Sequence, residues 1–137
     1  MPLAYERDDR RRRLIAVPSG TLTLEHCLEF LDRQAAEGTW SYAVLYDGRA
    51  RTAVLESAEL VRLVSRTAIL SKQHGPPGAL ALVRADAAGI GSARMFEIFS
   101  DQSGRQVGVF TTIEEAEAWL NEVTANPSRG PAGSGGA

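Results

Sequence analysis

The chain has 137 residues, 44% of them hydrophobic and 23% charged, and this length suits one domain with a sizeable core. A net charge of -2 argues against non-specific nucleic-acid binding, which needs a strongly basic surface, and no apolar run is long enough to span a bilayer. The single cysteine, Cys27, and a charged N-terminus without a signal-peptide core predict a cytoplasmic protein that is not transmembrane.

The first part of the chain predicts a β-hairpin and a helix. Residues 3–7 and 14–17 have strand character and flank a turn and an arginine run, which indicates an antiparallel pair. Thr23 is expected to cap a helix over residues 24–36. Cys27 lies within the apolar stripe of that helix, so we interpret it as a small core residue rather than a nucleophile.

The central stretch predicts a buried strand, a polar loop and a second helix. Residues 42–46 are a nearly unbroken apolar run, which is typical of a strand covered on both faces. Ser57 is expected to cap the helix that follows, with Glu59 near the positive end of the helix dipole.

This order places Ser57 at the carboxyl edge of the predicted sheet, where open α/β sheets usually bind their ligands. We therefore predict an interaction edge around Ser57. The other residues predicted to form this edge are Asp47, Arg49, Arg51, Glu56 and Asp86.

Residues 79–83 predict another buried strand, and a third helix is expected after a loop over residues 84–91. Gly89 and Gly91 look faintly like part of a dinucleotide-binding signature, but Arg94 stands at the third glycine position. We interpret these glycines as residues that permit close packing at the start of the helix.

The end of the chain predicts a last strand over residues 106–110 and a helix opened by a capping box of Thr112 and Glu115. The predicted order is β-β-α-β-α-β-α-β-α, which implies an α/β fold with a mixed, mostly parallel sheet covered by helices. Residues 1–123 are expected to form the domain, and residues 124–137 a disordered tail rich in small side chains.

The order and several local patterns resemble the SpoIIAA-like proteins, often called STAS/SEC14-domain proteins. The likeness extends over roughly residues 5–120. The stretches that carry it are residues 14–20 with Leu22 and Thr23, and residues 42–47, 91–96, 109–110, 114–116 and 119–120. The resemblance implies a SpoIIAA/STAS-like α/β domain with a regulatory, non-enzymatic function.

In the anti-anti-sigma members of that wider group, an Asp-Ser-Ser-Gly stretch opens the second helix and carries a phosphorylated serine. The corresponding residues here are Glu56, Ser57, Ala58 and Glu59, so Ser57 matches the phosphoacceptor by position. A phosphate at a helix N-terminus would meet free backbone N–H groups. A plain capping role for Ser57 is the alternative.

Three hypotheses about function follow. The first is a module that binds an unidentified protein partner at the Ser57 edge. The second is a module that binds an apolar small molecule or lipid, because other members of the group look related to lipid carriers. The third is a homodimer formed through the exposed first strand. No histidine is placed to activate a nucleophile or to complete a metal site, so we expect no catalytic residues, no metal and no cofactor.

Overall fold

A five-stranded sheet forms the centre of the computed structural model, which describes residues 3–51 and 53–125. The elements in chain order are β1 (Leu3–Asp8), β2 (Arg13–Pro18), α1 (Leu24–Ala36), β3 (Ala43–Asp47), α2 (Ser57–His74), β4 (Leu80–Val83), α3 (Ala87–Ser100), the short 3-10 helix η1 (Asp101–Ser103), β5 (Val107–Phe110) and α4 (Ile113–Ala125). This order confirms the predicted α/β fold.

The strands lie in the sheet in their order along the chain, β1-β2-β3-β4-β5. β1 pairs antiparallel with β2, with Leu3 opposite Pro18 and Asp8 opposite Arg13. The remaining pairs are parallel, with Leu14 opposite Val44 in β2 and β3. The mixed, mostly parallel sheet with one antiparallel edge strand is therefore as predicted.

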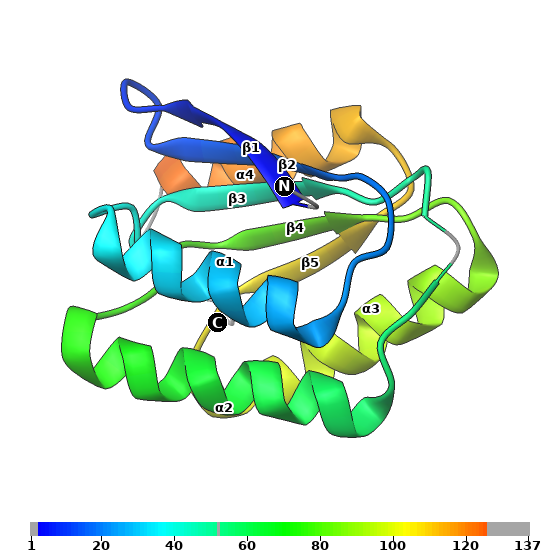
Figure 1. Cartoon of the computed structure of the whole chain (residues 1–137). Helices are drawn as coiled ribbons and strands as arrows, with labels where there is room; N and C mark the ends of the chain where they lie inside the picture. The colour runs from blue at the N-terminus through cyan, green and yellow to red at the C-terminus, as the bar shows by residue number, and fades with distance from the viewer. Residues whose placement is uncertain (1–2, 52, 126–137) are drawn as a thin grey trace.

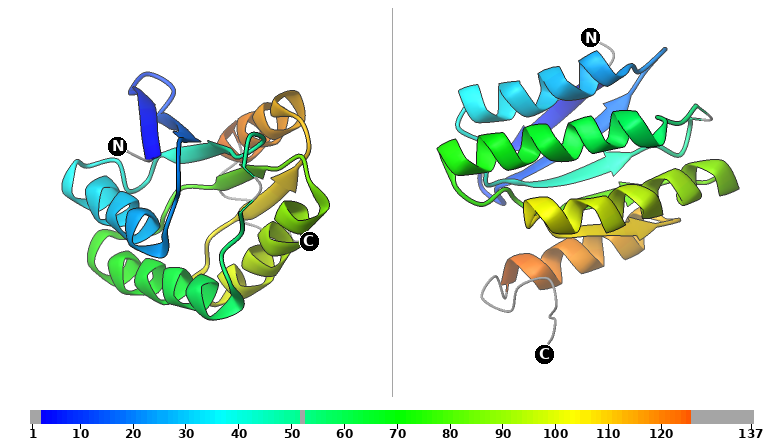
Figure 2. Two further views of the ribbon diagram at one scale, coloured as in Figure 1. Left: turned by 45° about the vertical axis from the view of Figure 1, so that its right-hand side comes forward. Right: turned by 90° about the horizontal axis from the view of Figure 1, so that it is seen from below.

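Helices α1, α2 and α3 lie side by side on one face of the sheet, and α4 covers the other face (Figures 1 and 2). Crossover connections between parallel strands are almost always right-handed. Because each new strand is added on the same side of the previous one, all three crossover helices fall on one face. α4 follows the last strand, so it is free to pack on the opposite face.

β3 and β4 bury both of their faces, as the apolar runs of residues 42–46 and 79–83 predict. Val44 and Leu80 contribute to a core under the crossover helices, while Leu45 and Ala81 pack with α4. Successive side chains of a strand point to opposite faces, which explains this division.

Three predicted boundaries are wrong by a few residues. Glu56, not Ser57, is the N-cap residue of α2. α3 begins at Ala87, capped by the side chain of Asp86, so the glycines at 89 and 91 are inside its first turns rather than in a loop. α4 continues to Ala125, two residues into the predicted tail, because residues 124 and 125 prolong the hydrogen-bonded helix. Residues 126–137, on which the rest of the tail prediction falls, lie outside the described residues.

Candidate functional site

The predicted edge residues do lie near the carboxyl ends of the strands, but ion pairs already occupy some of their charges. Both carboxylate oxygens of Asp47 accept hydrogen bonds from Arg49, at 2.9 and 3.0 Å. These bonds lower the pKa of Asp47. Asp86 is paired with the guanidinium of Arg84 at 3.2 Å. The charges of Asp47 and Asp86 are therefore neutralised by neighbouring arginines.

Ser57 is exposed, in agreement with its predicted position at the rim of the sheet. It is the first residue of α2 and does not cap the helix. Instead, the Glu59 carboxylate accepts the backbone N–H of Glu56 at 2.9 Å. The side chain of Ser57 makes no hydrogen bond to any residue within the described ranges.

The topology of the sheet places the expected binding crevice away from Ser57. Binding crevices of open α/β sheets form where neighbouring strands connect to helices on opposite faces. Here that point lies between β4, followed by α3, and β5, followed by α4. Ser57 follows β3, whose connection leaves on the same face as those of β2 and β4. Of the six predicted edge residues, Asp86 alone follows β4.

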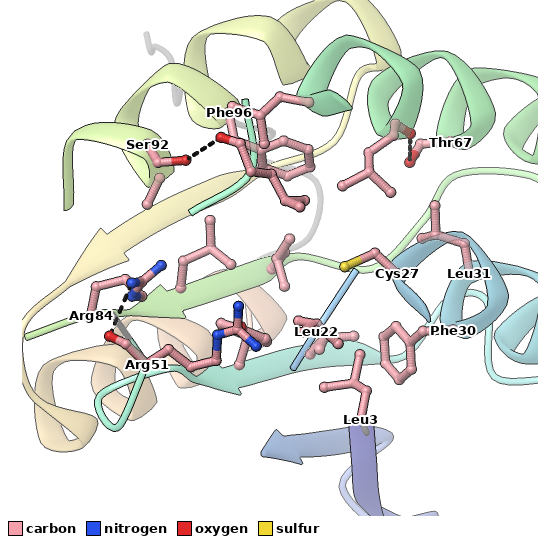
Figure 3. Close-up of a pocket in the computed structure, with 18 of the residues that line it drawn as sticks. Leu3, Leu22, Cys27, Phe30, Leu31, Arg51, Thr67, Arg84, Ser92 and Phe96 are labelled. Atoms are coloured by element: carbon pink, nitrogen blue, oxygen red, sulfur yellow. Dashed lines mark hydrogen bonds between the residues drawn. The ribbon is translucent and has the colours of Figure 1, made fainter. Parts of the chain in front are cut away.

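A hollow lies instead between the sheet and helices α1, α2 and α3 (Figure 3). It is a cavity of about 150 Å³. Its lining comes from all three helices, from strands β1, β3 and β4, and from connecting segments that include the one between β3 and α2. The apolar lining side chains are Leu3, Leu22, Phe30, Leu31, Val44, Ala53, Leu55, Leu60, Leu63, Leu80, Leu82, Ala93 and Phe96.

Most small polar groups of the lining are already satisfied or unreactive. The hydroxyl of Thr67 donates to the carbonyl of Leu63 at 2.9 Å, and that of Ser92 donates to the carbonyl of Leu55 at 3.4 Å. Burial raises the pKa of the Cys27 thiol to about 11. Cys27 is therefore a neutral thiol at physiological pH and not an activated nucleophile, in line with the prediction.

Arg84 closes one end of the cavity. Its side chain is buried, and one terminal nitrogen donates to the carbonyls of Arg51 and Ala53, at 3.1 and 3.4 Å. This ties the loop after β3 to the end of β4. Two glycines leave the space for the arginine: a Cβ at Gly89 would lie 2.3 Å from the guanidinium carbon, and one at Gly48 would lie 2.8 Å from Cδ. The interpretation of Gly89 as a close-packing residue is confirmed.

Two further arginines line the cavity. Arg51 is half-buried and donates to the carbonyl of Gly20 at 3.4 Å. Arg105 is buried at the amino end of β5, where its Nε donates to the carbonyl of Gly78 at 2.9 Å. Burial lowers the pKa of Arg105 to about 10, so it still carries its charge at neutral pH.

Sequence reasoning did not identify the cavity, Arg84 or Arg105. Leu3, Phe30 and Phe96 are far apart in the chain, and each fits an ordinary core pattern. Among these residues, Arg84 alone has a local pattern that could have indicated a functional position, because it is a charged residue directly after the buried strand of residues 79–83.

Within residues 3–51 and 53–125, no three His, Cys, Asp or Glu side chains are grouped so that they could hold a metal ion. In the same part of the chain, no helix combines the length and apolar character needed to cross a membrane. Comparisons of the chain with protein-family models, with curated proteins and with solved structures found no match.

Proposed function

We propose that this domain binds a small apolar molecule in the cavity between the sheet and helices α1, α2 and α3. The observation that carries the proposal is the cavity itself, which is about 150 Å³ in volume and lined mainly by leucine and phenylalanine side chains. Of the hypotheses drawn from the sequence, the second is thus the one the geometry supports best.

The volume of the cavity favours a compact ligand over a long lipid. A cavity of about 150 Å³ lined by Leu, Ile and Phe is known to admit benzene. Sites for drug-sized ligands are larger, on the order of 300–1,000 Å³. We therefore expect a ligand whose buried part is close in size to one aromatic ring, rather than a long acyl chain.

Apolar groups that line the hollow lack neighbouring protein atoms on the side that faces it. A ligand that fills the hollow restores the missing van der Waals contacts, and its binding therefore stabilises the fold.

Titration with toluene tests the proposal. We expect the ¹H–¹⁵N resonances of Cys27, Leu63 and Ala93 to shift in a saturable way, and the melting temperature to rise. Ala93→Leu, which fills the cavity from α3, should abolish binding. Ala88→Leu adds the same side chain at an exposed position of that helix and should leave binding intact. Wild-type spectra that do not change at millimolar toluene would rule out the proposal.

A second candidate function is the predicted protein-binding module regulated at Ser57. It is supported by the exposure of the Ser57 side chain at the first position of α2, where backbone N–H groups favour a phosphate. Ser57→Asp should change the set of proteins that the domain captures, whereas Ser65→Asp, at an exposed site further along α2, should not. Identical partners for both variants, together with an unmodified Ser57 in the native protein, would refute this function.

The SpoIIAA-like resemblance and the cytoplasmic location stay predictions based on residue patterns. The third hypothesis, a homodimer, relies on β1 as an edge strand, and β1 is at one end of the sheet order. Analytical ultracentrifugation tests that hypothesis, and a monomer at high concentration would dismiss it.

A further inference from the structure

The two ends of the cavity differ in charge. Each of the three crossover helices begins after the carboxyl end of a strand and returns antiparallel to the sheet (Figure 1). Their N-termini therefore gather at the carboxyl edge, each with about half a positive charge, and their C-termini gather at the opposite edge. The carboxyl end of the cavity is electropositive before any side chain is considered.

Side chains add to this positive potential. Arg51 extends into the cavity from the loop after β3, next to Leu22 (Figure 3). It makes no ion pair with a carboxylate among the described residues. None of the described side chains that line the cavity is acidic. Arg51 therefore presents a positive charge to a cavity that no acidic side chain of the described residues lines.

Two hydrogen-bond donors at the same end lack acceptors. Arg84 is only 7% exposed, and its buried Nε–H has no acceptor among the described residues. The Tyr46 hydroxyl makes no hydrogen bond within the described part of the chain. Burial raises the pKa of Tyr46, and the nearby positive charge of Arg51 opposes that shift. The phenol is therefore a protonated donor at neutral pH.

Arg105, at the far end, is balanced in a different way. It follows α3 and η1 and bonds to the carbonyl of Gly78, between the end of α2 and β4. The C-termini of α2 and α3 are at this end, and helix C-termini favour a cation. Continuing the register of β4 and β5 places Arg105 opposite Gly78. Gly78 is six positions before Arg84, so the backbone of Arg105 lies roughly 20 Å from that of Arg84. Arg105 therefore lies beside helix C-termini, which favour its charge although burial lowers its pKa, whereas Arg51 lies beside helix N-termini, which favour an anion.

We propose that the ligand is a small organic carboxylate, with its apolar body in the cavity and its acid group on the guanidinium of Arg51, where Tyr46 Oη–H supplies a further hydrogen bond. This inference rests on the proposed apolar-ligand function and adds the charge and orientation of the ligand. A carboxylate accepts several hydrogen bonds at once, and charge-assisted bonds of this kind are stronger than neutral ones.

Phenylacetate and phenylacetamide form a matched pair of probes, because they share a shape and differ in charge. Isothermal titration calorimetry at pH 7 should show phenylacetate binding roughly ten- to a hundredfold more tightly, as expected for a hydrogen-bonded charged group. Arg51→Gln should reduce phenylacetate affinity to about that of the amide. Tyr46→Phe should weaken phenylacetate several-fold. Arg62→Gln, which removes an exposed charge from α2, should leave the preference unchanged.

The outcomes separate this inference from the proposed function. Equal affinities for the two probes would overturn the inference while the apolar site stands. If none of toluene, phenylacetamide and phenylacetate binds, both the carboxylate inference and the proposed apolar-ligand function are overturned. The position of the acid group is read from the ¹H–¹⁵N shift differences between the two complexes, which should concentrate at residues 46–51 and 84–86. Differences centred on Gly78 and Arg105 would place the acid at the wrong end and refute the assignment.

Discussion

The two faces of the sheet are packed in different ways. On one face, α4 lies close to β3, β4 and β5 through small and medium side chains such as Ala43, Ala81 and Ala116, each at most 2% exposed. On the other face, three helices meet the sheet through larger residues, including Tyr46 and Phe96, and a cavity of about 150 Å³ is left among them.

The difference shows how packing depends on side-chain size. Alanines on both the sheet and α4 let the two backbones approach, so little space is left between them. On the other face, leucines, phenylalanines and tyrosines lie between the sheet and the helices, and these bulky side chains do not fill the space completely. The closely packed face supplies stability, and the open face has room for a ligand.

The largest expected effect is a loss of stability, and it should differ between the two faces of the sheet. Leu45→Ala, on the face covered by α4, should lower the free energy of unfolding by about 3–4 kcal/mol, because the tight packing cannot collapse around the new void. Leu63→Ala, at the edge of the cavity, should cost less, about 2 kcal/mol, because Leu63 already borders open space. Urea denaturation measures both, and equal losses would contradict the contrast between the faces.

A second prediction concerns stability at high pH. The folded pKa of Cys27, about 11, is above the ordinary value for a thiol, so ionisation favours the unfolded chain. The stabilisation that Cys27 contributes is complete below its unfolded pKa and is lost as the pH rises through about 9 to 11. The loss attributable to Cys27 should be on the order of 2 kcal/mol.

Cys27→Ala should remove that part of the decline in stability, as measured by urea denaturation at pH 8 and pH 11. Wild-type Cys27 should also react slowly with a thiol reagent at pH 8. Rapid reaction would indicate that water solvates the cavity, and the apolar character of the open face would then need revision.

The third prediction compares two glycines of α3. Gly89→Ala should destabilise the protein by about 1–3 kcal/mol, because the new Cβ displaces the hydrogen-bonded guanidinium of Arg84. Gly91→Ala meets nothing within 4 Å and should stabilise the helix by about 0.5–1 kcal/mol. Thermal denaturation gives both values. The same sign for both substitutions would mean that Arg84 does not hold the mouth of the cavity in place.

The smallest expected effect is at the predicted interaction edge. Arg49→Gln removes the partner of Asp47, but half of the Arg49 side chain is exposed and solvent screens the pair, so the loss of stability should be small. The low pKa of Asp47 implies that the contribution is present above its ordinary pKa and is lost as the pH falls. Wild type and variant should therefore converge at pH 2 in urea denaturation. A larger gap at pH 2 than at pH 7 would contradict this account.

Elements that depend on interactions between residues close in the chain could be predicted from the sequence. The hairpin, the helix capped by Thr23 and the strand of residues 42–46 depend on neighbours within a few positions, and they were predicted correctly. The starts of α2 and α3 were misplaced, because Glu56 and Asp86 compete with Ser57 and the later glycines as helix starts. The exposure of Ser57 followed from the strand–loop–helix order and is confirmed.

The sequence alone determined the order of the elements, the mostly parallel character of the sheet and the burial of β3 and β4, because periodicity and turn chemistry act locally. Only the tertiary structure decided that three helices share one face, that a cavity remains beneath them, and that Arg51, Tyr46 and Arg84 meet at its electropositive end. These features depend on contacts between residues more than thirty positions apart and on how closely side chains of unequal size can pack, and no local pattern in the chain records either.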